Sequence, residues 1–103
     1  EWILVSAGFD PHERDPLGGM EVTEEGFAAM ARALLEQAAT FSDGRIALVL
    51  EGGYDLPALR NSVAAVLAEM RAPQKNSLGA LPLSDSGIEP IVRRVLQVHE
   101  KYR

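Results

Sequence analysis

The chain has 103 residues, of which 47% are hydrophobic, so it can form the core of one domain or of part of one. Its 15 acidic and 10 basic residues give a net charge of −5, which argues against a nucleic-acid partner because no basic stripe is available to neutralise phosphates. It contains no cysteine, which excludes disulfides and thiolate metal sites.

Apolar runs in the sequence are short. None approaches the roughly 20 residues that are needed to span a bilayer, and no signal peptide precedes the first apolar segment. The lack of cysteine is compatible with a reducing compartment. We therefore expect a cytoplasmic protein that binds neither membranes nor nucleic acid.

The first apolar segment, residues 2–6, is predicted to be a strand. It is aliphatic and has little polar alternation, which is typical of a parallel sheet that is buried on both faces. A loop rich in Gly, Pro and Asp follows over residues 7–22. Thr23 is then predicted to cap a helix that has two glutamates in its first turn and ends near Phe41. The apolar stripe of this helix consists of Phe27, Met30, Ala31, Leu34, Leu35 and Ala38.

A second aliphatic strand is predicted over residues 45–50, and a second helix follows it. Asp55 is the expected N-cap of this helix, with Pro57 in the first turn, where a missing N–H costs little. The predicted apolar stripe consists of Leu56, Leu59, Val63, Val66, Leu67 and Met70. The pair Ala72-Pro73 is expected to end the helix.

The segments divide the chain into three parts. Residues 1–72 form a β-α-β-α segment, residues 73–86 a linker rich in Pro, Gly and Ser, and residues 87–103 a C-terminal helix. Ser86 in a capping box and Gly87 as the cap are alternative starts for that helix, and the sequence does not decide between them. Its apolar stripe is Ile88, Ile91, Val92, Val95 and Leu96.

Residues suited to chemistry follow both strands. Asp10 comes shortly after the first strand and Tyr54 shortly after the second, and ligands of parallel α/β sheets bind at the carboxyl ends of the strands. The pairs Gly18-Gly19 and Gly52-Gly53 permit a close backbone approach to a ligand. A tyrosine at this place can direct its hydroxyl at a developing oxyanion. Taken singly, each feature also has a structural explanation as a turn or a cap.

The two loops and the helix between them form a more specific combination. The residues are Ser6-Ala7-Gly8-Phe9-Asp10, His12, Asp15-Pro16-Leu17-Gly18-Gly19, a helix begun by Thr23, and Leu50-Glu51-Gly52-Gly53-Tyr54-Asp55. This combination resembles the histone deacetylase family, and it looks closest to the bacterial branch of acetoin-utilisation and acetylpolyamine amidohydrolase-like proteins. The resemblance covers essentially the whole chain and corresponds to the C-terminal third of that fold.

The resemblance implies a fold and an activity. The fold is α/β, a fragment of the parallel-sheet arginase/deacetylase-like architecture in the order β-α-β-α-α. The family uses one zinc ion to deacetylate acetyl-lysine or acetylated amines. By the match, Asp10 is a zinc ligand, Tyr54 hydrogen-bonds the scissile carbonyl as a catalytic residue, and three residues bind substrate. These three are Leu17, Gly52 and Gly53.

The sequence also departs from the family pattern. The family's other zinc ligands, an Asp-x-His pair, and its general-base histidine pair lie upstream of the matched segment and are absent here. A catalytic zinc ion normally has three protein ligands and a water. We therefore expect the chain alone to be inactive, with zinc belonging to the intact family domain. His12 makes a second metal site with Asp10 conceivable, with further ligands from a neighbouring copy, but a loop histidine that hydrogen-bonds the backbone is the favoured interpretation.

A second hypothesis belongs to a different class of protein. Two buried-type strands without neighbours leave sheet edges that invite pairing, so we expect a homodimer or higher oligomer. The alternative function is a self-associating structural module on a deacetylase-derived scaffold. Nucleotide binding by a generic β-α-β unit is weaker, because no Gly-x-Gly-x-x-Gly motif opens the first helix.

Overall fold

The computed structural model describes residues 1–72 and 89–101. The elements are β1 (Ile3–Ala7), α1 (Glu24–Phe41), β2 (Ile46–Leu50), α2 (Leu56–Arg71) and α3 (Glu89–Glu100). This order confirms the α/β prediction and the sequence of elements β-α-β-α-α. The predicted linker over residues 73–86 and the two alternative caps, Ser86 and Gly87, lie outside the described residues.

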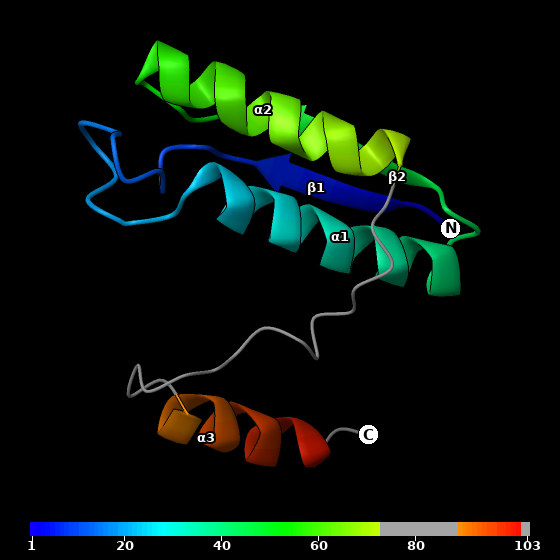
Figure 1. The fold of residues 1–103 in the computed structure, drawn as a ribbon. Coiled ribbons are helices and arrows are strands. Elements are labelled where there is room, and N and C mark those ends of the chain that lie inside the picture. Colours follow the sequence, from blue (N-terminus) through cyan, green and yellow to red (C-terminus); the bar gives the residue numbers. More distant parts are fainter. Residues whose placement is uncertain (73–88, 102–103) are drawn as a thin grey trace.

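The two strands form a parallel sheet with β1 beside β2. The register pairs Ile3 with Ile46 and Ala7 with Leu50. Both α1 and α2 run opposite to the strands, as chain reversal after each strand requires (Figure 1). The two helices contact each other and cover the same face of the sheet. The first 72 residues thus form two layers, one of strands and one of helices.

The other face of this sheet has no cover from the described residues. Burial alternates along β1, and Leu4 is 74% exposed. On β2 the side chain of Val49, on the same face, is exposed as well. The prediction that both faces are buried is therefore wrong within the described residues, because α1 and α2 lie on one side of the sheet. Trp2 is also exposed.

Both helices of the helical layer begin at the predicted caps. The Thr23 hydroxyl accepts a hydrogen bond from the amide of Gly26 at 3.3 Å. The Asp55 carboxylate accepts one from the amide of Ala58 at 2.8 Å. Each cap satisfies one of the amides that a helix leaves unpaired in its first turn. The N-cap predictions are therefore confirmed.

The core lies where the helices meet the carboxyl end of β1. Phe9 and Phe27 are buried with their ring centroids 4.9 Å apart, in a tilted arrangement that aromatic pairs favour. Ala31 of α1 and Val66 of α2 complete the cluster. Burying a large apolar side chain contributes about 1.5–3 kcal/mol, so this small cluster is a main source of stability. Phe9 of this cluster directly precedes Asp10 in the sequence.

The most buried face of α2 matches the predicted stripe only in part: Val66 is buried, and Leu59 and Val63 pack against the core. The buried residues of this helix are Ala58, Ser62, Val66 and Glu69. In contrast, Leu56 and Leu67 of the predicted stripe are exposed. Small side chains permit the close approach of α1, and the ion pair between Arg32 and Glu69, at 2.6 Å, allows a carboxylate to be buried there.

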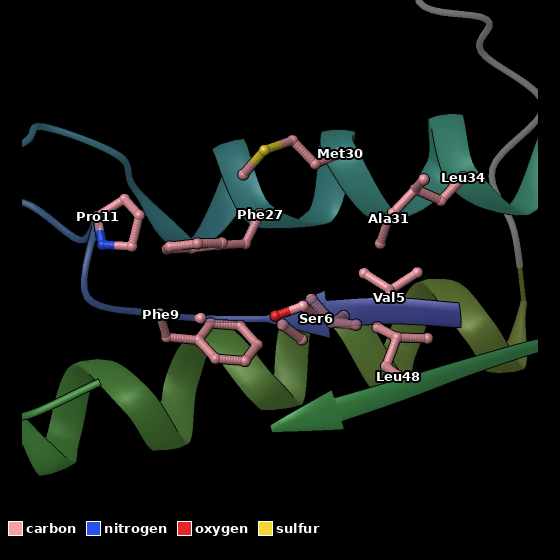
Figure 2. A pocket seen from close by; sticks show the side chains of 12 residues that line it. Val5, Ser6, Phe9, Pro11, Phe27, Met30, Ala31, Leu34 and Leu48 are labelled. Carbon is pink, nitrogen blue, oxygen red and sulfur yellow. The ribbon is translucent and has the colours of Figure 1, made fainter. Parts of the chain in front are cut away.

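Two apolar hollows remain beside the sheet. One, of about 180 Å³, lies between β1 and α1, and Figure 2 shows Phe27, Met30, Ala31 and Leu34 on the α1 side of it and Val5 on the β1 side. The other lies along β2 and is lined by Val63, Leu67 and other aliphatic residues. No titratable residue is among the described residues that line either hollow. We interpret both as incompletely filled core at the edges of the strands.

The apolar residues Ile91, Val95 and Leu96 of helix α3 are exposed, and so is His99. Ile88 of the predicted stripe lies outside the described residues. In the described parts of the chain, no helix has the length and apolar character needed to cross a membrane.

Two buried serines are expected to respond in opposite ways to alanine substitution. Among the described residues the Ser62 hydroxyl has no hydrogen-bond partner, so Ser62→Ala should stabilise the protein by about 1 kcal/mol. The Ser42 hydroxyl lies 3.0 Å from the carbonyl oxygen of Ala38 and 2.9 Å from that of Arg45, so Ser42→Ala should cost about 1 kcal/mol. Urea unfolding of both variants, followed by circular dichroism, measures the difference. If both substitutions changed the free energy of unfolding in the same direction, the hydrogen-bond assignment of the two hydroxyls would be contradicted.

Candidate functional site

The two loops leave the sheet side by side because the parallel ladder continues beyond the strands. The amide of Glu51 donates to the carbonyl oxygen of Ala7 at 3.1 Å, and the amide of Phe9 donates to the carbonyl oxygen of Gly52 at 2.9 Å. These bonds hold the start of each loop to its neighbour. Asp10 therefore enters its loop directly beside Gly52, at the carboxyl edge of the sheet.

Glycines make room for the carboxylate of Asp10. A Cβ atom at Gly52 would overlap this carboxylate, and one at Gly8 would lie 2.7 Å from its Oδ1 atom. A Cβ atom at Gly18 would overlap the backbone carbonyl oxygen of Asp10. Three glycines from the two loops thus pack around one acidic residue, a closeness that other residue types would prevent.

Tyr54 and Leu17 stand at the surface of the described chain. Gly53, with a φ of +133°, turns the second loop and lies against the side chains of Phe9 and Leu59. The side chain of Tyr54 that follows is 59% exposed, and that of Leu17 is 72% exposed. The described residues therefore provide one side of a site at this edge and leave its opposite side open.

A buried carboxylate, that of Asp15, joins the two loops. Its Oδ1 atom accepts hydrogen bonds from the amides of Leu17, at 2.8 Å, and Gly18, at 3.0 Å. Its Oδ2 atom accepts one from the amide of Tyr54 at 2.7 Å. Desolvation alone would raise the pKa of Asp15, but the bonds from Tyr54, Leu17, Gly18 and Asp55 outweigh it and lower the pKa. Asp15 is thus held in its charged form.

His12 lies beneath the first loop rather than in the site. It is 1% exposed, and its ring stacks on that of Phe27 at a centroid distance of 6.3 Å. Its Nδ1 atom accepts a hydrogen bond from the amide of Arg14, and its Nε2 atom lies 3.5 Å from the carboxylate of Glu24. The favoured prediction, a loop histidine bonded to the backbone, is confirmed.

The contacts of His12 also affect the first turn of α1. The pKa of Glu24 is lowered by a hydrogen bond from its own backbone amide and, to a lesser degree, by the His12 ring. The loop is closed nearby by backbone bonds from Val22 to Pro11 and from Glu13 to Val22. The first loop is therefore anchored to the helix at one end and to the second loop at the other.

A catalytic zinc ion normally has three protein ligands and a water. The Asp10 carboxylate at the sheet edge is a suitable oxygen ligand, and Asp10 is partly exposed. No group of three or more His, Cys, Asp and Glu side chains that can hold a metal occurs in residues 1–72 or 89–101. The described residues thus provide one ligand and do not form a catalytic zinc site by themselves. His12 is 1% exposed and its Nε2 atom faces the carboxylate of Glu24, so a second metal site with Asp10 stays a prediction.

Comparison with known proteins identifies the family. The model of the histone deacetylase domain matches residues 1–70, which contain both strands, both long helices and all of the loop residues described above. This chain belongs to the histone deacetylase family. The resemblance recognised in the sequence is thereby confirmed at the level of the family, whereas the bacterial branch is not specifically supported.

Named deacetylases and a solved deacetylase structure are similar to the chain. Histone deacetylase 10, chloroplastic, of Oryza sativa subsp. japonica is 48% identical over 62 residues, which cover 60% of the chain and 14% of that protein. Histone deacetylase 18 of Arabidopsis thaliana is 41% identical over 97 residues, covering 92% of the chain and 13% of that protein. Polyamine deacetylase HDAC10 of Mus musculus is 39% identical over 92 residues, covering 88% and 13%.

A crystal structure of the HDA15 HD domain matches the fold with a TM-score of 0.59 and 32% identity. The match covers 69% of this chain and 20% of that structure. The chain thus spans about one seventh or less of the curated deacetylases named above and one fifth of the solved domain.

Sequence reasoning missed the contacts of two buried residues that hold the loops in place, Asp15 and His12. Asp15 was recognised only as part of the motif combination, and the hydrogen bond that it accepts from the amide of Tyr54 spans 39 positions, which local patterns do not reveal. His12 was assigned to a loop without its burial against Phe27. The only available signal was the spacing Asp15-Pro16-Leu17-Gly18, which matches a side chain that caps its own turn.

Proposed function

We propose that this chain forms one side of the catalytic pocket of a zinc-dependent deacetylase that hydrolyses acetyl-lysine or acetylated amines. Asp10 contributes one zinc ligand, and Tyr54 donates a hydrogen bond to the carbonyl of the scissile amide. Leu17, Gly52 and Gly53 line the slot that receives the acylated side chain. The observation that supports this assignment is the meeting of the Asp10 and Tyr54 loops at the carboxyl edge of a parallel sheet.

The chemistry of the two main residues suits these roles. A phenol that donates to an oxygen where negative charge develops stabilises the transition state of amide hydrolysis. Asp10 is partly exposed, and a partly exposed carboxylate is available to a cation. A zinc ion bound by a complete ligand set polarises the amide carbonyl. Since the described residues provide one ligand, we propose that the chain is inactive alone and that the remaining groups come from the rest of a deacetylase domain.

The substrate class follows from the slot and from the relatives. Leu17 is apolar and exposed, and the adjoining glycines present no side chains, so the surface accepts a neutral acylated amine better than a charged one. One relative, the mouse protein, is named a polyamine deacetylase. Acetyl-lysine and acetylated polyamines are therefore both candidates, and membership in the acetylpolyamine branch stays a prediction.

A hybrid enzyme tests the proposed function. In the HDA15 HD domain, the segment that matches this chain is replaced by the chain's own residues 1–70. The hybrid should bind zinc and deacetylate acetyl-lysine peptide or acetylated polyamine. Tyr54→Phe should lower kcat roughly 100-fold with zinc retained, because one oxyanion donor is lost. Asp10→Asn should lose zinc in calorimetric titration.

The matched control is Asp43→Asn, which changes an exposed aspartate remote from the site. It should leave zinc binding and turnover unchanged. The isolated chain should show neither stoichiometric zinc binding nor turnover. Full activity of the Tyr54→Phe hybrid, or amide hydrolysis by the isolated chain, would overturn the proposal.

Self-association is the second candidate, and the uncovered sheet face favours it. Leu4 and Leu56 are both 74% exposed, but only Leu4 lies on that face of the sheet. If the chain forms a homodimer or higher oligomer through its strands, Leu4→Lys should shift it to monomer and Leu56→Lys should not, since lysine on a strand discourages pairing. Light scattering at high micromolar concentration measures the mass. A monodisperse monomer of the unmodified chain contradicts this candidate.

A further inference from the structure

The contacts of Asp15 connect residues that the proposed function assigns to different tasks. Leu17 belongs to the substrate slot and Tyr54 to the carbonyl, and both donate their amides to this one carboxylate. The third donor, Gly18, lies so close to the carbonyl oxygen of Asp10 that a Cβ atom would overlap it. One buried side chain thus lies at the junction of the slot, the tyrosine and the metal ligand.

We propose that Asp15 is a positioning residue that fixes Tyr54 and Leu17 relative to Asp10. This proposal rests on the proposed function, because it concerns the residues of that same pocket. Asp15 itself does not touch the substrate, since its two carboxylate oxygens face backbone amides and its side chain is 8% exposed. Its effect on catalysis is therefore exerted through the backbone of the two loops.

The geometry requires a carboxylate rather than an amide at this position. Oδ1 accepts from the first loop and Oδ2 accepts from the second, so both side-chain atoms must be acceptors. The amide of an asparagine has one acceptor and one donor. Whichever way it turns, its NH₂ group faces either the amide of Tyr54 or the amides of Leu17 and Gly18. Asp15→Asn therefore breaks the connection between the loops while it preserves the size of the side chain.

The test is nuclear magnetic resonance on the full chain. In the folded protein, Asp15→Asn should reduce the hydrogen-exchange protection of Tyr54, or of Leu17 and Gly18 together, by roughly tenfold or more, which corresponds to one hydrogen bond to a charged group. Asp15→Ala should reduce all three. The amide of Phe9, which donates to Gly52, should keep its protection and is the internal control. Spectra recorded well below the unfolding temperature separate this local loss from global destabilisation.

A pH titration gives a second signature. The pKa of Asp15 lies below its ordinary value of 3.8, so its contribution to stability is fully present above pH 3.8 and is lost as the pH falls through the lower, folded-state pKa. The amide signals of Leu17, Gly18 and Tyr54 should therefore move together below pH 3.8. In Asp15→Asn this common titration should vanish.

The outcomes separate this inference from the proposed function. Unchanged protection and unchanged amide signals of Tyr54 and Leu17 in Asp15→Asn overturn the positioning role, whatever the hybrid enzyme does. If Asp15→Asn loses this protection while the Tyr54→Phe hybrid is fully active, the positioning role of Asp15 stands. The assignment of these residues to a catalytic pocket is then overturned instead. Independent titrations of the three amides would also overturn the inference, because they would require more than one acidic group.

Discussion

Replacing Phe27 with alanine is expected to lower the free energy of unfolding by about 3–5 kcal/mol, as truncation of a buried aromatic residue usually does. The side chain is 5% exposed and packs against Phe9 on one side and the His12 ring on the other. Small domains have total stabilities of about 5–15 kcal/mol, so the variant should be largely unfolded or close to it. Urea unfolding followed by circular dichroism measures the change.

The same helix provides the control for this substitution. Phe41, at the last turn of α1, is 66% exposed, and Phe41→Ala should change stability by less than about 0.5 kcal/mol. Equal losses for the two phenylalanines would show that the core does not lie where the helices meet β1. The milder substitution Phe27→Leu retains most of the apolar volume of the side chain. It should therefore lower the free energy of unfolding much less than Phe27→Ala does.

Gly18→Ala is expected to have the second-largest effect, at or above the upper end of the roughly 1–3 kcal/mol that overpacking usually costs. The added methyl group would overlap the backbone carbonyl oxygen of Asp10, and the next atoms in its way are also backbone. Backbone cannot rotate aside as a side chain can, so the first loop must move. The amide signals of Asp10 and His12 should therefore shift in the spectrum of this variant.

The neighbouring glycine separates crowding from conformational strain. Gly19 has a φ of +60° and no atom within 4 Å of an added Cβ, so Gly19→Ala should cost only the roughly 1–2 kcal/mol of a left-handed alanine. It should leave the signals of Asp10 in place. If Gly19→Ala destabilised the protein as much as Gly18→Ala and moved Asp10 equally, contact with Asp10 would not be the reason for glycine at position 18.

Local features of the fold were predictable from the sequence. The caps Thr23 and Asp55 are side chains that bond amides three residues away, so short patterns identify them. The two aliphatic strands were recognised in the same way, and their parallel pairing follows from the helix between them. The pairing of the Asp10 and Tyr54 loops at one edge follows from the topology.

Features that depend on distant partners were not predictable. Glu69 is charged, yet it is buried because Arg32 faces it from another helix. Ser62 was overlooked because the helical stripe was defined by apolar side chains, whereas the contact with α1 needs small ones. The exposure of Leu4 was also missed, since strand composition indicates how a residue can be buried but not whether the covering layer is present.

The carboxylate between the two loops has a consequence for protein engineering. Because Tyr54 and Leu17 share one acceptor, neither loop has a conformation that is independent of the other. Transplanting the first loop alone into another member of the family would leave the recipient's second loop facing a foreign acceptor, and the reverse exchange would leave an unmatched amide. Loop grafts within this family should therefore succeed when both segments are moved as a pair, and their individual effects on activity should be strongly non-additive.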